Sequence, residues 1–283
     1  MPATTIAEAL NTATASLAAA GIAGARHEAS ALLAEVYGCD RLALLRQSAE
    51  PIAADRARDY DDLLRRRRGG EPLSRIRRRR EFWSLELEIG PAVLDPRPDS
   101  EALVAAVLEQ VPGRDAALRL LDLGTGSGCL LLALLSELPA ARGLGVDRDP
   151  AAVALAQCNA RRLGLAARAG FLAGDWLSAI DAEMDVIVCN PPYVRRDAIA
   201  ALAREVREHE PVAALDGGVD GLDAYRALIP GLAARLVSGG LAAFEVGAGQ
   251  AAAVAAMFTQ AGFAEVRVRA DLAGIPRCVL ARG

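Results

Sequence analysis

The chain has 283 residues, a formal net charge of −4 and a hydrophobic content of 53%, much of which is alanine. This length is sufficient for one large and one small domain. No apolar run approaches the ~20 residues that a membrane-spanning helix requires, and no signal peptide is evident. The net charge does not indicate a nucleic-acid binder. We therefore expect a soluble enzyme with no membrane partner.

The cysteines and histidines argue against a metal site. The five cysteines are scattered, odd in number and form no C-x-x-C pair, so neither zinc nor disulfides are expected. We interpret them as small buried hydrophobic residues of a protein in the reducing cytoplasm. The chain has two histidines, His27 and His209, so a histidine metal cluster is not expected.

Residues 1–75 are predicted to form a small helical domain. One of its helices is predicted to begin at Pro51 and to stop at Gly69-Gly70. The alternating apolar and polar residues over 82–89 predict a hairpin strand, within a linker that spans residues 76–95.

Nine arginines lie within sixteen residues at the end of this region, at positions 65–68, 75 and 77–80. The plainer interpretation is a solvated helix end and linker. The alternative is an electrostatic patch that guides an acidic protein or an RNA. Because the guanidinium fork suits carboxylates and phosphates equally, the pattern does not identify a partner.

Residues 96–283 are predicted to form the catalytic domain. Asp99 and Ser100 are predicted to cap a helix over 102–110. From Leu118 onward, apolar strands and helices alternate, which predicts a mostly parallel sheet in an α/β fold.

A glycine-rich loop follows the first of these strands, residues 118–123, and precedes an apolar helix over 129–135. Its glycines permit a tight turn and close approach of a ligand to the backbone, and the helix N-terminus offers free N–H groups to an anion. This order begins a nucleotide-binding α/β unit, although the G-x-G-x-G spacing differs from that of dinucleotide sites. The residues expected to bind a cofactor here are Asp122, Gly124, Thr125, Gly126, Ser127 and Gly128.

Two acids follow at the ends of later apolar segments. Asp147 ends the segment 143–147, where a carboxylate can accept hydrogen bonds from two ribose hydroxyls. The alternative for Asp147 is a solvated acid at a strand end. Asp175 and Trp176 come soon after another apolar pair, and an acid with an indole can bond an adenine amine and lie against its ring. By itself, such a pair is more often part of an ordinary loop than of a binding site.

The tetrapeptide Asn190-Pro191-Pro192-Tyr193 ends a short β-branched run over 186–189. Because proline has no N–H, the chain must leave the sheet here, at the edge where ligands bind in open α/β sheets. Carbonyl acceptors, the Asn190 amide and the flat face of Tyr193 together suit a planar group that carries an NH2. The alternative is an ordinary Pro-Pro turn. The charged segment 194–223 that follows is a candidate lid.

The order of these segments resembles that of Rossmann-like methyltransferases that use S-adenosylmethionine (SAM), and Asn-Pro-Pro-Tyr marks those that methylate a planar NH2. A longer resemblance, from about residue 25 onward, is to the HemK/PrmC family of protein-(glutamine-N5) methyltransferases. That family modifies the glutamine of the Gly-Gly-Gln loop in peptide chain release factors. The resemblance rests on residues 81–83, 93–101, 205–211, 214–223, 245–247 and 271–274.

This resemblance implies a seven-stranded sheet whose final strand is antiparallel, with residues 1–75 recognising the substrate. It implies that Arg97 and Glu101 line the cofactor pocket, that the enzyme acts as a monomer, and that the chemistry requires no nucleic acid. The substrate amide is expected to contact residues 190–193, where the Asn190 side-chain oxygen and the Pro191 carbonyl accept from its NH2 while Tyr193 packs on its plane. Methyl transfer is then a direct displacement without a general base.

The chain departs from the family pattern in two places. Residues 75–78 stand where the family has Tyr-Ile-x-Gly, and Ser84 stands where it has glycine. Three other functions stay open: glutamine methylation of a ribosomal protein, adenine amino-methylation of a nucleic acid, and SAM-dependent regulation without catalysis.

Overall fold

The computed structural model describes residues 4–283, and the chain divides into two compact units, Met1–Arg78 and Arg79–Gly283. The hairpin predicted within the linker therefore belongs to the second unit. No helix among the described residues combines the length and apolar character needed to cross a membrane.

The first unit is helical, as the sequence predicts. Its helices are α1 (Ile6–Ala19), α2 (Ala25–Tyr37), α3 (Arg41–Arg46), α4 (Ala54–Arg68) and α5 (Leu73–Arg77). Thr5 and Glu8 form a reciprocal capping box at the start of α1. Leu17, Leu32 and Leu33 are buried in the core of this unit, where the Tyr60 phenol on α4 donates to the Ala29 carbonyl on α2 at 2.9 Å.

The prediction that a helix begins at Pro51 is wrong. Pro51 pairs with Thr5 in an isolated antiparallel bridge, and Ile52 donates its N–H to the Thr4 carbonyl at 2.9 Å. Ala53 is still extended, with φ −66° and ψ 146°, so α4 begins at Ala54. The long-range pairing with the start of the chain outweighs the local preference of proline for the first turn of a helix.

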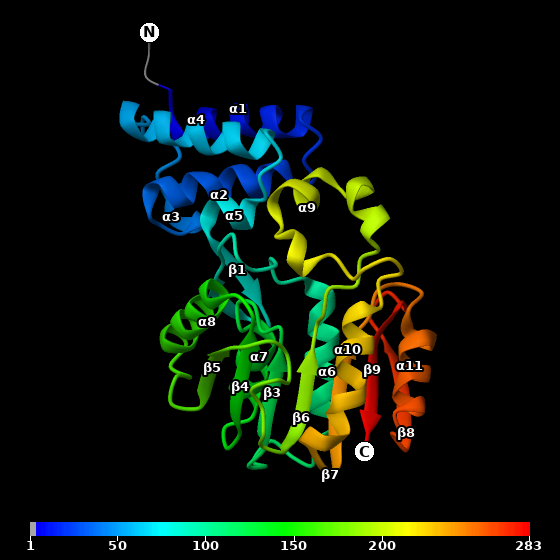
Figure 1. Ribbon diagram of the computed structural model, residues 1–283. Coiled ribbons are helices and arrows are strands. Elements are labelled where there is room, and N and C mark those ends of the chain that lie inside the picture. The colour runs from blue at the N-terminus through cyan, green and yellow to red at the C-terminus, as the bar shows by residue number, and fades with distance from the viewer. Residues whose placement is uncertain (1–3) are drawn as a thin grey trace. The chain divides into compact units, whose positions relative to one another are not determined.

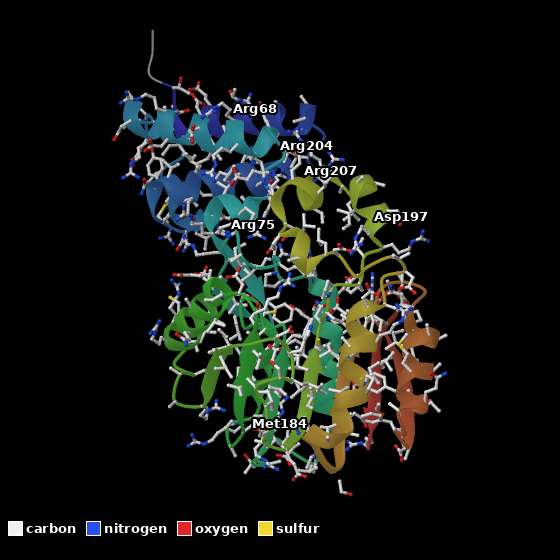
Figure 2. The ribbon with its side chains drawn as sticks, viewed as in Figure 1. Arg68, Arg75, Met184, Asp197, Arg204 and Arg207 are labelled. Atoms are coloured by element: carbon white, nitrogen blue, oxygen red, sulfur yellow. The ribbon has the colours of Figure 1, made fainter. Side chains whose placement is uncertain are left out.

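Carboxylates neutralise much of the arginine-rich segment. On α4 and α5, ion pairs within the first unit join Arg65 to Asp62, Arg66 to Glu71, Arg67 to Glu28 and Arg77 to Glu35. In the second unit, Arg79 pairs with Glu86 and Arg80 with Asp95. Arg68, labelled in Figure 2, donates instead to the Ser16 hydroxyl at 3.1 Å. These contacts favour the interpretation as a helix end and linker over an electrostatic patch that guides an acidic protein or an RNA.

The second unit is built on a seven-stranded sheet with strand order β5-β4-β3-β6-β7-β9-β8 (Figure 1). Its strands are β3 (Arg119–Leu123), β4 (Arg142–Asp147), β5 (Ala169–Ala173), β6 (Met184–Cys189), β7 (Leu236–Glu245), β8 (Glu265–Ala270) and β9 (Pro276–Arg282). The pairs among β3 to β7 are parallel, whereas β9 is antiparallel to both of its neighbours. The implied antiparallel final strand is confirmed.

Helices cover both faces of this sheet. They are α6 (Glu101–Gln110), α7 (Cys129–Glu137), α8 (Pro150–Arg162), α10 (Asp223–Leu232) and α11 (Ala251–Gln260). The short helix α9 (Arg204–His209) buries no residue and contacts the preceding 3-10 turn rather than the sheet. Alternate strand residues face opposite sides, so Leu120 packs with α6 and α7 while Leu121 packs with α10 and α11. The central strands β3 and β6 are buried on both faces and are mostly apolar in the sequence, whereas the edge strands β5 and β8 are largely exposed.

The hairpin consists of β1 (Arg79–Phe82) and β2 (Leu85–Glu88), with Phe82 and Leu87 buried against α6 and α7. Its turn residues Trp83 and Ser84 both have positive φ, 52° and 58°. Arg78, which precedes β1, also has φ 53°. Arg78 and Ser84 thus occupy left-handed conformations where the resembling family carries glycine, the residue that adopts them at no steric cost.

Candidate active site

The carboxyl ends of β3, β4, β5 and β6 border a cavity of about 280 Å³, near the lower end of the range for small-molecule sites. Met184 marks the opposite, amino end of β6 in Figure 2. The predicted site residues that line this cavity are Arg97, Gly124, Thr125, Gly126, Ser127, Asp147, Asp175, Trp176, Asn190 and Pro192. The predicted residues that lie outside its lining are Glu101, Asp122, Gly128, Pro191 and Tyr193.

The glycine loop is fastened to the end of β4. The N–H groups of Gly124 and Thr125 both donate to the Val146 carbonyl at 2.9 Å. Gly124 has φ +71°, and a Cβ atom on it would lie 3.3 Å from the Trp176 ring. Glycine is required here because both the backbone conformation and the contact with the indole disfavour a side chain.

Asp122, on β3, holds the glycine loop through a hydrogen bond with Thr125. Its carboxylate is buried, and Oδ2 accepts the Thr125 hydroxyl at 2.7 Å, while Oδ1 has no hydrogen-bond partner among the described residues. Burial raises the pKa of Asp122 to about 7, although the hydrogen bond from Thr125 acts in the opposite direction. Asp122 therefore acts on the cavity through Thr125, which lines it.

Asp147 holds two segments of the cavity wall together. Its Oδ2 accepts from the Gly126 N–H at 2.9 Å, and its Oδ1 accepts from the Asp149 N–H at 3.0 Å. Each carboxylate oxygen keeps a further lone pair. The side chain can therefore accept hydrogen bonds from a pair of ligand hydroxyls without losing either backbone contact.

Trp176 and Asp175 form the wall that follows β5. The indole is half-buried against Gly124, whereas Asp175 is exposed. The backbone of Trp176 is left-handed, with φ 50°, a conformation that costs a non-glycine residue about 1–3 kcal/mol. The surrounding structure therefore holds the indole at this position against a local conformational preference.

The Asn190 side chain is held in one orientation at the end of β6. Its Nδ2 donates to the Ser100 hydroxyl at 3.0 Å. Within residues 4–283, its Oδ1 forms no hydrogen bond, and Asn190 lines the cavity. The amide thus offers a free acceptor, next to Pro191, which is buried, and Pro192, which is half-buried.

Tyr193 is directed toward the end of β7. Its phenol donates to Glu245 Oε1 at 3.3 Å, and a Cβ atom on Gly247 would lie 2.9 Å from its ring. Burial raises the pKa of Tyr193. Glu245 is buried too, and among the described residues its Oε2 has no hydrogen-bond partner. Burial raises the pKa of Glu245 to about 7, against the opposing effects of Ser100 and of the Tyr193 phenol.

An ion pair joins the segment before α6 to the segment after α9. Arg97 Nη2 donates to Glu210 Oε1 at 2.9 Å, and the Asp95 N–H donates to Glu210 Oε2 at 3.0 Å. The Glu210 side chain is 1% exposed. Glu101 instead accepts the Trp83 N–H at 2.9 Å and so holds the hairpin turn.

The segment between β6 and α10 carries short helical turns and α9 rather than a long loop. Arg204 and Arg207 lie on α9 and Asp197 on the preceding turn (Figure 2). Arg204 and Arg207 both pair with Glu208. Pro211 and two alanines that follow α9 line the cavity, which brings this candidate lid to the site.

The prediction that Ser100 caps a helix is wrong. Its side chain forms no capping hydrogen bond. Pro98–Ser100 form a 3-10 turn, so Ser100 has φ −68° and ψ −16° instead of the extended backbone of an N-cap residue. Its hydroxyl is available to Asn190 for that reason. No pattern in the sequence indicates a role for Glu210 or Glu245.

Two family models match the chain. The model described as "PrmC N-terminal domain" matches residues 8–77, and the one described as "Methyltransferase small domain" matches residues 98–212. Among solved structures, the hMettl16 catalytic domain has a TM-score of 0.58 at 17% identity and covers 78% of this chain and 81% of its own. A methyltransferase from Pyrococcus furiosus has a TM-score of 0.53 at 15% identity and covers 70% and 88%. These structures share the methyltransferase fold.

Curated relatives extend over nearly the whole chain. A release factor glutamine methyltransferase of Rhodospirillum rubrum is 45% identical over 94% of this chain and 81% of its own. One of Bradyrhizobium diazoefficiens is 44% identical over 98% of this chain and 94% of its own. With this identity and coverage, joined to the fold and the Asn190 loop described above, the chain belongs to the family of release factor glutamine methyltransferases.

Proposed function

We propose that this enzyme transfers a methyl group from SAM to the side-chain amide nitrogen of the glutamine in the Gly-Gly-Gln loop of peptide chain release factors. The observation that carries the proposal is the orientation of Asn190, whose Nδ2 is engaged by Ser100 and whose Oδ1 is left for an incoming NH2. The names of the relatives support the substrate class. Because release factors act in the cytoplasm, we place the enzyme there as well.

The cavity residues fit the proposed cofactor. The glycine loop allows a ligand to approach the backbone closely, Asp147 keeps lone pairs for ribose hydroxyls, and Trp176 presents an indole to an adenine. When bound, SAM would supply a methyl group on a sulfonium: the glutamine nitrogen would form a bond to the methyl carbon as the carbon–sulfur bond breaks, S-adenosylhomocysteine would leave, and the nitrogen would lose a proton.

The protein assists by alignment and by charge stabilisation. An amide nitrogen is a weak nucleophile because its lone pair is delocalised into the carbonyl. Hydrogen bonds from the NH2 to Asn190 Oδ1 and to the Pro191 carbonyl orient that lone pair and stabilise the positive charge that develops on nitrogen. The methylated nitrogen becomes strongly acidic, so no side chain has to remove its proton beforehand.

The test is to incubate the purified chain with radiolabelled SAM and an extract that contains ribosomes and release factors. We expect label on a release factor, and loss of that label when the Gly-Gly-Gln glutamine is replaced by glutamate. Label on a ribosomal protein or on nucleic acid would replace the proposed substrate by one of its rivals, and no label on any component would contradict methyl transfer.

A further inference from the structure

The side chain of Gln250 joins three backbone segments beside the active site. Gln250 directly precedes α11. Its Oε1 accepts the Gly247 N–H at 2.9 Å, and its Nε2 donates to the Tyr193 carbonyl at 3.0 Å and to the Gly221 carbonyl at 3.2 Å. One amide thus bonds to the loop after β7, to the turn after β6 and to the chain that leads into α10.

The three partners fix the orientation of the Gln250 amide. A backbone carbonyl can only accept a hydrogen bond, and a backbone N–H can only donate one. The Gln250 NH2 therefore has to face the two carbonyls, and its oxygen has to face Gly247. An ionised glutamate, which has nearly the same shape, would keep the bond to Gly247 but would turn an acceptor toward two acceptors.

Two glycines leave the space that the Gln250 amide occupies. Gly221 is buried and has φ +80°; a Cβ atom on it would clash with the Tyr193 carbonyl oxygen and would lie 2.5 Å from Gln250 Nε2. A Cβ atom on Gly247 would lie 2.7 Å from Gln250 Oε1. Both distances are shorter than real Cβ contacts, so the backbone is closely packed around the amide.

The two carbonyls that accept from Gln250 lie at the two ends of the segment between β6 and α10. Figure 1 shows this segment leaving and rejoining the sheet at the same edge. The Val194 N–H donates to the Leu215 carbonyl at 2.9 Å, and the Gly217 N–H donates to the Val194 carbonyl at 2.8 Å. These bonds join the two ends to each other. Gln250 in turn joins both ends to the loop that follows β7, the strand next to β6.

We propose that Gln250 is a positioning residue for methyl transfer, which fastens the turn 190–193 so that it keeps the position in which it binds the substrate amide. This inference rests on the proposed function, in which that turn contacts the glutamine. The described residues that line the cofactor cavity include neither Gln250 nor Tyr193. Loss of the Gln250 hydrogen bonds should therefore slow methyl transfer and leave SAM binding nearly unchanged.

The experiment compares Gln250→Glu and Gln250→Met with the wild type, using radiolabelled SAM and purified release factor. Titration with SAM counts the binding sites in each preparation, so that kcat is expressed per folded site. For Gln250→Glu we expect kcat to fall about 10- to 100-fold, because a displacement of about 1 Å can cost ~10²-fold. Gln250→Met fills a similar space without polar atoms, so we expect a loss of about 5- to 20-fold. KM for SAM should stay within about 3-fold in both variants.

The matched control is Gln260→Glu, which makes the same chemical change at the exposed far end of the same helix. We expect its kcat and both KM values within about 2-fold of wild type. Hydrogen exchange of the protein without substrate measures the fastening itself. The amides of Val194 and Gly217 should exchange about 5-fold faster in Gln250→Glu, because the pair of ends has lost its bonds to the loop after β7.

Three results would overturn the positioning role. They are a kcat per SAM site within 2-fold of wild type in either Gln250 variant, a KM for SAM that rises as much as kcat falls, and unchanged exchange at Val194 and Gly217. Should Gln250→Glu fail to fold, Gln250→Met decides alone. A wild-type enzyme that leaves the release factor unlabelled would instead contradict the proposed function. The two failures are distinguishable because hydrogen exchange needs no substrate and the kinetic test reads only differences among variants of an active enzyme.

Discussion

Replacing Glu210 by glutamine should weaken cofactor binding indirectly, through Arg97 and Asp95. Glu210 accepts both the Arg97 guanidinium and the Asp95 N–H, and its side chain is 1% exposed. The glutamine amide has one oxygen, so one of the two donors must then face an NH2. Leaving a buried donor without a partner costs about 1–3 kcal/mol, and the Arg97 side chain, 34% exposed, is partly compensated by water.

This loss acts on the cavity wall because Arg97 and Pro211 both line it. If about 1–2 kcal/mol of this cost disfavours the conformation in which Arg97 and Pro211 line the cavity, the apparent Kd for SAM rises about 5- to 30-fold. Isothermal titration of the purified variant with SAM measures this directly. The matched control is Glu208→Gln, which removes surface ion pairs of α9 with Arg204 and Arg207; exposed pairs contribute little, so Kd should change less than 3-fold. Equal affinities for Glu210→Gln and wild type would refute the reasoning.

Three further outcomes follow from the site and the hairpin. Asn190→Ala should lower kcat roughly 10²-fold, as the loss of one transition-state contact does, with a smaller effect on SAM affinity by titration; near-normal turnover would remove Asn190 from the mechanism. Ser84→Gly should relieve a left-handed backbone conformation that costs ~1–2 kcal/mol, offset by the ~0.5–1 kcal/mol of extra conformational entropy that glycine loses on folding. Calorimetry should therefore show Tm raised about 1–4 °C. The same gain in a Ser84→Ala control would exclude backbone strain as the cause. Asp122 has a folded pKa of about 7, above its unfolded value of about 3.9, so its contribution to stability is complete below pH 4 and is lost as the pH rises toward 7. Asp122→Asn should therefore raise Tm by several degrees at pH 8 and by less at pH 5, and an equal gain at both would contradict the assignment.

The sequence identifies the elements whose signals are local. The β-branched run that precedes Asn190-Pro191 is β6, and the apolar helix predicted over 129–135 is α7. The run of alternating residues over 82–89 contains the turn and the second strand of the hairpin, whose first strand begins earlier, at Arg79. In each case the residues that specify the element lie within it or directly beside it, so a reading of the sequence finds them.

What escaped prediction depends on contacts between distant residues. Ser100 meets a side chain that lies 90 residues later, and the Asp95 N–H meets Glu210 115 residues later. A serine after an aspartate before an apolar helix carries the same local signal whether it caps the helix or faces a neighbouring strand. The Pro51 segment is similar, because its extended form depends on Thr5, which no pattern around residue 51 indicates.

The place of β9 in the sheet implies an order of assembly. β8 precedes β9 in the chain, yet β9 lies between β7 and β8. β8 therefore joins the sheet only by way of a strand that is synthesised after it, and the two are expected to dock as a preformed hairpin. That hairpin delivers Arg277 to the neighbourhood of Glu245. An early folding species could already contain the glycine loop and the Asn190 turn, but the charge that balances its buried acid would arrive last.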